Sequence, residues 1–195
     1  DGHRLARVEI ALPDGAGEMP GIIVPRKAVA ELRKLIEETD GDIAVQLSDS
    51  KIRFAFGDVV LTSKLIDGTF PDYERVVPAD NDKTMTVVTK ALLDAVDRVS
   101  TISTEKSRAI KLIVETGKLT LTATSPEEGS ATEEIDADYA GEQIDIGFNS
   151  RYVLDMTAQI EGDSVELVMA DGTSPTLVRD TGDEGALYVI MPMRV

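Results

Sequence analysis

Apolar and polar positions follow one pattern three times along this chain, at intervals of roughly 60 residues. Each time, a short apolar run leads into a segment with helical periodicity, and segments of strand-like character follow. The three runs open at residues 21–29, 85–93 and 144–153. A period of this length indicates one supersecondary unit used repeatedly, so we expect three consecutive β-α-β-β-β units.

The first unit predicts a helix over residues 25–38, with Pro25 in its opening turn, where a missing N–H group is tolerated. At about 100° per residue, one side of this helix is apolar and the other is basic. The apolar side, which should face a sheet, consists of Ala28, Val29, Leu32, Leu35 and Ile36. The outward side, here called the basic stripe, consists of Arg26, Lys27, Arg33 and Lys34.

The second unit predicts a helix over residues 90–102, and the third predicts a helix that begins after an Asn149 or Ser150 N-cap. Short turn sequences separate the strand-like segments of each unit, which indicates antiparallel neighbours. The predicted strands are 43–47, 52–56 and 59–64 in the first unit, 109–115, 118–125 and 131–139 in the second, and 164–169, 175–179 and 186–193 in the third.

A single unit leaves free strand edges, so units two and three together should form one complete domain. The first unit, preceded by a strand-like segment at residues 4–12 without a partner, should be the second half of another domain. We therefore divide the chain into residues 1–77, an interdomain linker at 78–83, and a domain at 84–195. The predicted fold class is α+β.

The chain has 195 residues, of which 42% are hydrophobic, and no cysteine, so it can bury a core without disulfides. We expect a cytoplasmic protein, and its first residue, Asp1, suggests a fragment. The formal charge of −16 disfavours binding to polyanions. The acidic residues concentrate at 127–138 and 180–184, however, away from the basic stripe.

Catalysis that depends on histidine or cysteine is disfavoured, because His3 is the only histidine and the chain has no cysteine. Three glycines at positions 15, 17 and 21 lack the spacing of a dinucleotide-binding loop. We expect no catalytic residue, no metal and no cofactor.

Two features remain open to more than one interpretation. The basic stripe is either a solvated helix face or a surface that follows phosphates. The apolar end of the chain, residues 188–195 with two methionines, is either a last core strand or a surface for varied apolar partners.

Three stretches, DGHRLA at 1–6, TSKLIDGTFPDY at 62–73 and YVIMPMR at 188–194, closely resemble the bacterial sliding clamp family, the beta subunit of DNA polymerase III. The GFN and YVLD segments at 147–149 and 152–155 extend the resemblance. It implies a subunit of three similar domains, each with two β-α-β-β-β units. In that family, sheets lie outside, helices line a central hole, and two subunits close head to tail around duplex DNA.

The resemblance implies that this chain is the second half of the middle domain plus the C-terminal domain of such a clamp. Its partners would be duplex DNA, bound without sequence preference, and the replicative polymerase, clamp loader and repair proteins, bound through short linear motifs. The full-length protein would be a homodimer. DNA-facing residues would be Arg26, Lys27, Arg33, Lys34, Lys90, Arg98 and Arg151.

The family also has a peptide-binding groove, whose matching positions come from separate segments of this chain. The groove residues would be Gly2, His3, Arg4, Leu5, Pro71, Arg75, Val76, Asn149, Tyr152, Thr173, Pro175, Val189, Met191, Pro192, Met193 and Arg194. The chain departs from the family pattern near Thr173 and Pro175, and at Val195, where leucine is common.

Two other functions remain as alternatives to a processivity clamp. One is a β-rich small-ligand-binding or enzymatic domain, which would need a convergent set of chemical groups. The other is a generic protein-interaction scaffold that does not bind DNA.

Overall fold

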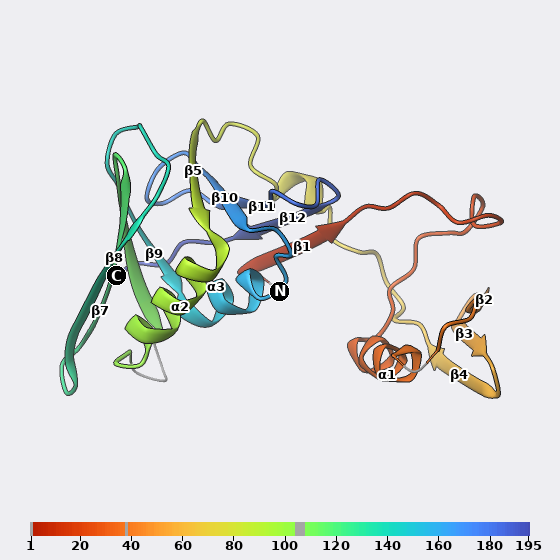
Figure 1. The fold of residues 1–195 in the computed structure, drawn as a ribbon. Coiled ribbons are helices and arrows are strands. Elements are labelled where there is room, and N and C mark those ends of the chain that lie inside the picture. Colours follow the sequence, from red (N-terminus) through yellow and green to blue (C-terminus); the bar gives the residue numbers. More distant parts are fainter. Residues whose placement is uncertain (1, 38, 104–107) are drawn as a thin grey trace. The chain divides into compact units, whose positions relative to one another are not determined.

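A computed structural model describes residues 2–37, 39–103 and 108–195 of the chain (Figure 1). The chain divides into two compact units. The larger unit comprises Asp1–Ala11 and Asp72–Val195, and the smaller unit comprises Leu12–Pro71. Within the described residues, no helix has the length and apolar character needed to cross a membrane.

The smaller unit consists of one helix, α1 (Arg26–Ile36), and an antiparallel sheet in the order β2-β3-β4. Its strands are β2 (Ala44–Leu47), β3 (Lys51–Phe56) and β4 (Val59–Lys64). Alternate side chains of β3, those of Ile52, Phe54 and Phe56, form its core, and Leu32 and Ile36 of α1 pack against them. The predicted end of this helix at Glu38 lies outside the described residues.

The predicted apolar side of α1 is only partly covered. Ala28 is buried, but Val29 is 51% exposed and Leu35 is 37% exposed, so the prediction is wrong for these two residues. The physical reason is that this unit offers α1 only one sheet of three strands. A helix with a wide apolar stripe needs a second packing partner to bury it completely.

The larger unit contains two antiparallel sheets and two helices, α2 (Thr89–Ser100) and α3 (Ser150–Thr157). One sheet has the order β1-β12-β11-β10-β5, and the other has the order β8-β7-β6-β9. The strands are β1 (Arg4–Val8), β5 (Lys83–Val88), β6 (Ala109–Glu115), β7 (Lys118–Ser125), β8 (Gly129–Asp136), β9 (Ile144–Asn149), β10 (Ser164–Met169), β11 (Thr176–Asp180) and β12 (Ala186–Ile190).

The second and third repeats exchange their opening strands. β5 opens the second repeat but pairs with β10 of the third, where Met85 faces Leu167. β9 opens the third repeat but pairs with β6 of the second, where Ile146 faces Leu112. The helices α2 and α3 lie side by side, as Figure 1 shows, and both contribute to one buried cluster. The two repeats therefore share a single core.

The segment at residues 4–12 was expected to be a strand without a partner, and this expectation is wrong. β1 pairs with β12, so that Leu5 faces Val189. Leu5 also packs against a buried cluster formed by Val168, Leu177 and Val189. Apolar burial and a free β12 edge together explain the pairing.

The predicted α+β class with antiparallel sheets is confirmed, and the β-α-β-β-β order appears in the second and third repeats. Residues 21–24, which open the first predicted unit, form no strand ahead of α1. The predicted strand at 186–193 ends earlier, at Ile190, because the chain leaves the sheet there. The amide of Met191 donates to the carbonyl oxygen of His3 instead, and Pro192 has no N–H to offer.

A buried carboxylate joins two backbone segments of the larger unit. Asp180 is 5% exposed, and its carboxylate accepts hydrogen bonds from the amides of Glu161 (2.8 Å), Gly162 (3.1 Å) and Gly182 (2.7 Å). Burial by itself raises the pKa of Asp180, but the three N–H donors outweigh burial and hold the pKa below its usual 3.8.

We predict that Asp180→Asn lowers the free energy of unfolding by about 1–3 kcal/mol at pH 7, because the amide group cannot accept all three bonds. Urea denaturation measures this loss. Since the pKa of Asp180 is depressed by folding, its stabilisation is present above pH 3.8 and is lost as the pH falls through the folded-state pKa. The difference between the variant and wild type should therefore shrink in acid.

Asp183→Asn is the matched control, because Asp183 is exposed and accepts one bond, from the amide of Gly185. Equal losses in the two variants would contradict the role given to Asp180.

Candidate functional site

Most of the predicted groove residues lie in the larger unit, where the structure brings their segments together. Pro71 belongs to the smaller unit, so its place in the groove stays a prediction. The other predicted residues lie in the turn before β1, in β1, around η1 (Tyr73–Arg75), at the start of α3, in the loop at 171–175, and in β12 with the tail after it.

Tyr152 of α3 is the meeting point of the first of these segments. Its ring stacks on the His3 ring with 6.4 Å between centroids, and the Arg4 guanidinium carbon lies 4.4 Å from the ring centre. The amide of Met191 donates to the carbonyl oxygen of His3 at 2.9 Å. The turn before β1 is therefore held between α3 and the tail.

A pocket of about 350 Å³ lies beside this contact, and four predicted residues line it: Arg4, Leu5, Tyr152 and Val189. Sequence reasoning missed Asp155, Met156 and Gln159, which also line it. Their spacing of three, four and seven residues from Tyr152 gives one helical face, a signal present in the sequence. Asp155 accepts a hydrogen bond from Arg4 at 2.7 Å and lies 4.0 Å from Arg151.

An apolar cluster also adjoins the β1-β12 pair. Leu5 packs there against buried Val189, and the partly buried neighbour from the segment after η1 is Val77. Val76, which the sequence predicted, is exposed. Arg75 is an exposed cation, with its side chain 85% exposed and its Nε 2.8 Å from an Asp72 oxygen. This region therefore combines apolar side chains with an accessible positive charge.

The loop at 171–175, which carries Thr173 and Pro175, is fixed by two side chains that sequence reasoning missed. Asp171 accepts the amides of Thr173 (2.7 Å) and Ser174 (2.8 Å). Hydrogen bonds from the backbone and hydroxyl of Thr173, followed by those from Ser174, lower the pKa of Asp171 to about 2. The Asp-Gly-Thr-Ser sequence is a signal for such a turn.

Asn81, in the predicted linker, is the second of these side chains. Its amide group donates to the carbonyl oxygens of Val168 (2.7 Å) and Pro175 (2.9 Å). It therefore attaches the end of the loop to β10.

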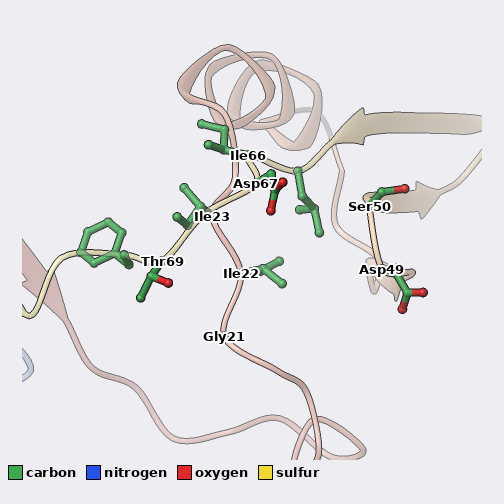
Figure 2. Close-up of a pocket in the computed structure, with 11 residues that line it drawn as sticks. Gly21, Ile22, Ile23, Asp49, Ser50, Ile66, Asp67 and Thr69 are labelled. Carbon is green, nitrogen blue, oxygen red and sulfur yellow. The ribbon is translucent and has the colours of Figure 1, made fainter.

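A cavity in the smaller unit contains none of the predicted groove residues. It has a volume of about 790 Å³ (Figure 2). Figure 2 shows Ile22 and Ile23 on one run of chain, with Ile66 and Asp67 on the run after β4. The amide of Ile66 donates to the carbonyl oxygen of Ile23 at 2.9 Å. The lining is open and mixed in polarity, without a convergent set of reactive groups.

The predicted DNA-facing residues differ in how they are paired. On α1, the four members of the basic stripe are exposed, and Lys34 lies 3.3 Å from Glu31. Among the described residues, no acidic group forms an ion pair with Arg26, Lys27 or Arg33. Four basic side chains against one acidic side chain give α1 a positive surface.

On α2 and α3, each predicted cation faces a carboxylate. Lys90 lies 2.8 Å from Asp94, and Arg98 donates to Glu133 at 3.0 Å through Nε. These partners lower the pKa of Asp94 and of Glu133. Arg151 shares Asp155 with Arg4. The pairs of Arg98 with Glu133 and of Arg4 with Asp155 join distant parts of the chain, whereas Lys90–Asp94 and Arg151–Asp155 have the i,i+4 spacing of a helix and were a signal present in the sequence.

The described residues contain no group of three or more histidines and carboxylates placed to hold a metal ion. Repeated α+β units with antiparallel sheets define the DNA clamp class of fold. Family models agree: residues 1–72 match the central domain of the DNA polymerase III beta subunit, and residues 74–194 match its C-terminal domain. The chain belongs to the DNA polymerase III beta subunit family.

Individual relatives show the same similarity. The chain is 53% identical to the beta sliding clamp of Caulobacter vibrioides and 39% identical to that of Escherichia coli K12. The alignments cover all of this chain but only 52% and 53% of the length of those two proteins. The chain therefore spans about half their length. A DnaN sliding clamp from Bartonella birtlesii, solved bound to griselimycin, has a TM-score of 0.96 and 51% identity over all of this chain and 53% of its own.

One predicted groove residue has a structural role that can be tested separately. Asn149 caps α3, because its Oδ1 accepts the amide of Arg151 at 3.0 Å. We predict that Asn149→Ala lowers the free energy of unfolding by about 1 kcal/mol, while Asn149→Asp retains most of the stability. Chemical denaturation followed by circular dichroism measures both. Equal stability of the alanine variant and wild type would show that the cap contributes nothing.

Proposed function

We propose that this chain is part of a sliding clamp, a processivity factor that encircles duplex DNA and tethers the replicative polymerase and other proteins through a peptide-binding groove. The observation that carries the proposal is the convergence of the turn before β1, α3, the loop at 171–175 and the tail. These segments come from distant parts of the sequence, and a pocket of about 350 Å³ lies between β1, α3 and β12. Grooves of this kind suit short extended peptides.

Hydrogen bonds that recur between repeats support the proposed domain organisation. In the second repeat, Thr86 and Asp138 exchange backbone hydrogen bonds, and in the smaller unit the amide of Ile66 donates to Ile23. The amide of Ala137 donates to Gly117 in the second repeat, just as that of Leu65 donates to Ser50. The smaller unit is therefore built like one repeat of a two-repeat domain.

The same comparison identifies what the smaller unit lacks. In the larger unit, Met85 and Val87 of β5 are fully buried, since β10 of the other repeat pairs with that strand. Ile22 and Val24, on the matching run, are only partly buried. A second repeat would cover this run, the cavity beside it and the exposed Val29 of α1. This supports the smaller unit, Leu12–Pro71, as part of one half of the clamp middle domain. We propose residues 1–77 for that half, followed by a linker at 78–83 and the C-terminal domain at 84–195.

In the groove, Leu5, Val76, Val189 and the tail methionines would hold leucine or phenylalanine side chains of a partner. Arg75 and Arg194, both exposed, would bind its polar or terminal groups. The partners would be the polymerase, the clamp loader and repair proteins, each with a short linear motif. No cofactor takes part, and the role is not catalytic.

The charge pattern supports α1 as the principal DNA-facing helix. Its basic stripe is largely without ion pairs among the described residues, whereas Lys90, Arg98 and Arg151 are each close to a carboxylate. Weak phosphate contacts suffice when a closed ring retains the duplex, and they allow sliding. The ring itself would be a cytoplasmic homodimer of the full-length protein. The small-ligand and enzyme alternatives have no supporting observation.

We predict that a labelled peptide with a Gln-x-x-Leu-Phe motif binds the chain, and that Met191→Ala and Arg75→Ala each weaken binding about 5- to 30-fold. Met191 supplies apolar contact, and Arg75 supplies charge. Fluorescence anisotropy measures the affinities. Met19→Ala and Arg53→Ala are matched controls, since both residues are exposed in the smaller unit. Unchanged affinity in both groove variants would refute the assignment of the groove.

We also predict that reversing the charge of Arg26 and Lys27 to glutamate shortens the residence of the full-length clamp on nicked circular DNA several-fold at low salt. Repulsion from phosphates is the cause, so added salt should reduce the difference. The control is the double reversal of Lys51 and Lys64, exposed neighbours on β3 and β4 with the same change in charge. Equal residence times for the two double variants would exclude a specific role of α1.

A further inference from the structure

The outer edge of β9 supports the tail of the chain. β9 is the last strand of its sheet, and the carbonyl oxygen of Gly147 in this strand accepts the amide of Met193 at 2.9 Å. Gly147 is buried. A Cβ atom at this position would lie 2.6 Å from a γ-carbon of Val195 and would also collide with the carbonyl oxygen of Met193. The tail is therefore packed directly on the backbone of β9.

Space, rather than backbone conformation, requires glycine at this position. Gly147 is not among the residues with positive φ, so alanine suits its backbone angles. Heavy atoms essentially never approach a Cβ atom within 3.0 Å, so a methyl group at 147 must displace the tail. The obstruction includes backbone, which cannot move out of the way as the end of a flexible side chain can.

The tail connects the two sheets of the larger unit. At one end, Met191 donates to His3, beside β1 of the five-stranded sheet, and two residues later Met193 donates to Gly147 in the four-stranded sheet. Pro192 lies between these two bonds and makes none through its nitrogen. The two bonds therefore set where the side chains of Met191 and Met193 lie.

A second close approach to β9 positions the loop at 171–175. A Cβ atom at Gly172 would collide with the carbonyl oxygen of Asp145, two residues before Gly147. Gly172 belongs to the loop that carries Thr173 and Pro175. β9 thus serves as the common support of the loop and the tail.

We propose that Gly147 is a positioning residue for peptide recognition: its missing side chain lets the tail lie on β9, which places Met191, Met193 and Arg194 for the partner. The proposal rests on the proposed peptide-binding function of the groove. Gly147 acts through the tail and has no contact with the peptide itself.

The test is Gly147→Ala in the full chain, with binding of the labelled Gln-x-x-Leu-Phe peptide as the first measurement. We expect affinity to fall at least tenfold, because the tail must leave β9. Gly41→Ala is the matched control, since Gly41 has open space around it and no positive φ. Equal affinity of Gly147→Ala and wild type, when wild type binds, would overturn the proposal.

An NMR spectrum of the methionine methyl groups distinguishes displacement of the tail from a general disturbance of the fold. In Gly147→Ala, the methyl signals of Met191 and Met193 should shift, while those of Met85 and Met169, which are fully buried in the core, should stay. Shifts in all four would indicate a disturbed core and would count against the proposal. If wild type itself fails to bind the peptide, the proposed function fails, whereas unshifted tail methionines refute the positioning alone.

A second variant tests the steric cause. Val195→Ala removes the γ-carbons nearest to the added methyl, and Val195 is 61% exposed, so this change alone should leave affinity near that of wild type. Combined with Gly147→Ala, it should restore part of the lost affinity. Additive or worse loss in the double variant would contradict a collision with the Val195 side chain.

A measurement on the unaltered chain covers the case in which Gly147→Ala does not fold. Saturating peptide should slow hydrogen exchange at the amide of Met193, since binding holds the tail on β9. An exchange rate unchanged by the peptide would overturn the proposal without any variant.

Discussion

The larger unit depends on the exchange of opening strands between its two repeats. Because β5 pairs with β10 and β9 pairs with β6, each sheet is completed by the other repeat. The shared core contains side chains from both repeats and both helices, among them Met85, Leu92, Ile146 and Val165, which are almost wholly inaccessible. Burial of this apolar surface is the main stabilising contribution, and neither repeat obtains it alone. In the smaller unit, which has one repeat, the opening run is only partly buried and part of the helix is exposed.

The candidate groove is a consequence of the same exchange. It places β9 at the edge of one sheet, while β1 adds to the edge of the other next to β12. The tail, after leaving β12 at Ile190, passes from His3 to Gly147 and joins these two edges. Predicted groove residues from distant segments are thereby held by backbone hydrogen bonds and by the stacking of His3 and Arg4 on Tyr152. Such preorganisation reduces the entropy lost when a flexible partner binds.

Much of the fold could be predicted from the sequence, because periodicity is a local property. The helix after Asn149 and the strands of each repeat follow from apolar spacing and turn residues. The pairing of β1 with β12 could not be predicted in this way, since it joins residues nearly 190 positions apart by register alone. The exposure of Val29 and Leu35 was missed for a related reason: a helical stripe reports what a helix can bury, and only the packing partners decide what it does bury.

The groove residues came from a family resemblance, and the structure adds the contacts that position them. Asp171, Asn81 and Gly147 carry no chemistry that marks a site, yet they fix the loop and the tail. The most direct test of the account is a methyl and amide chemical-shift titration of the chain with the clamp-binding peptide. The account predicts shifts at Tyr152, Met191 and Met193. Shifts confined instead to the cavity of the smaller unit, at Ile22 and Ile66, would contradict it.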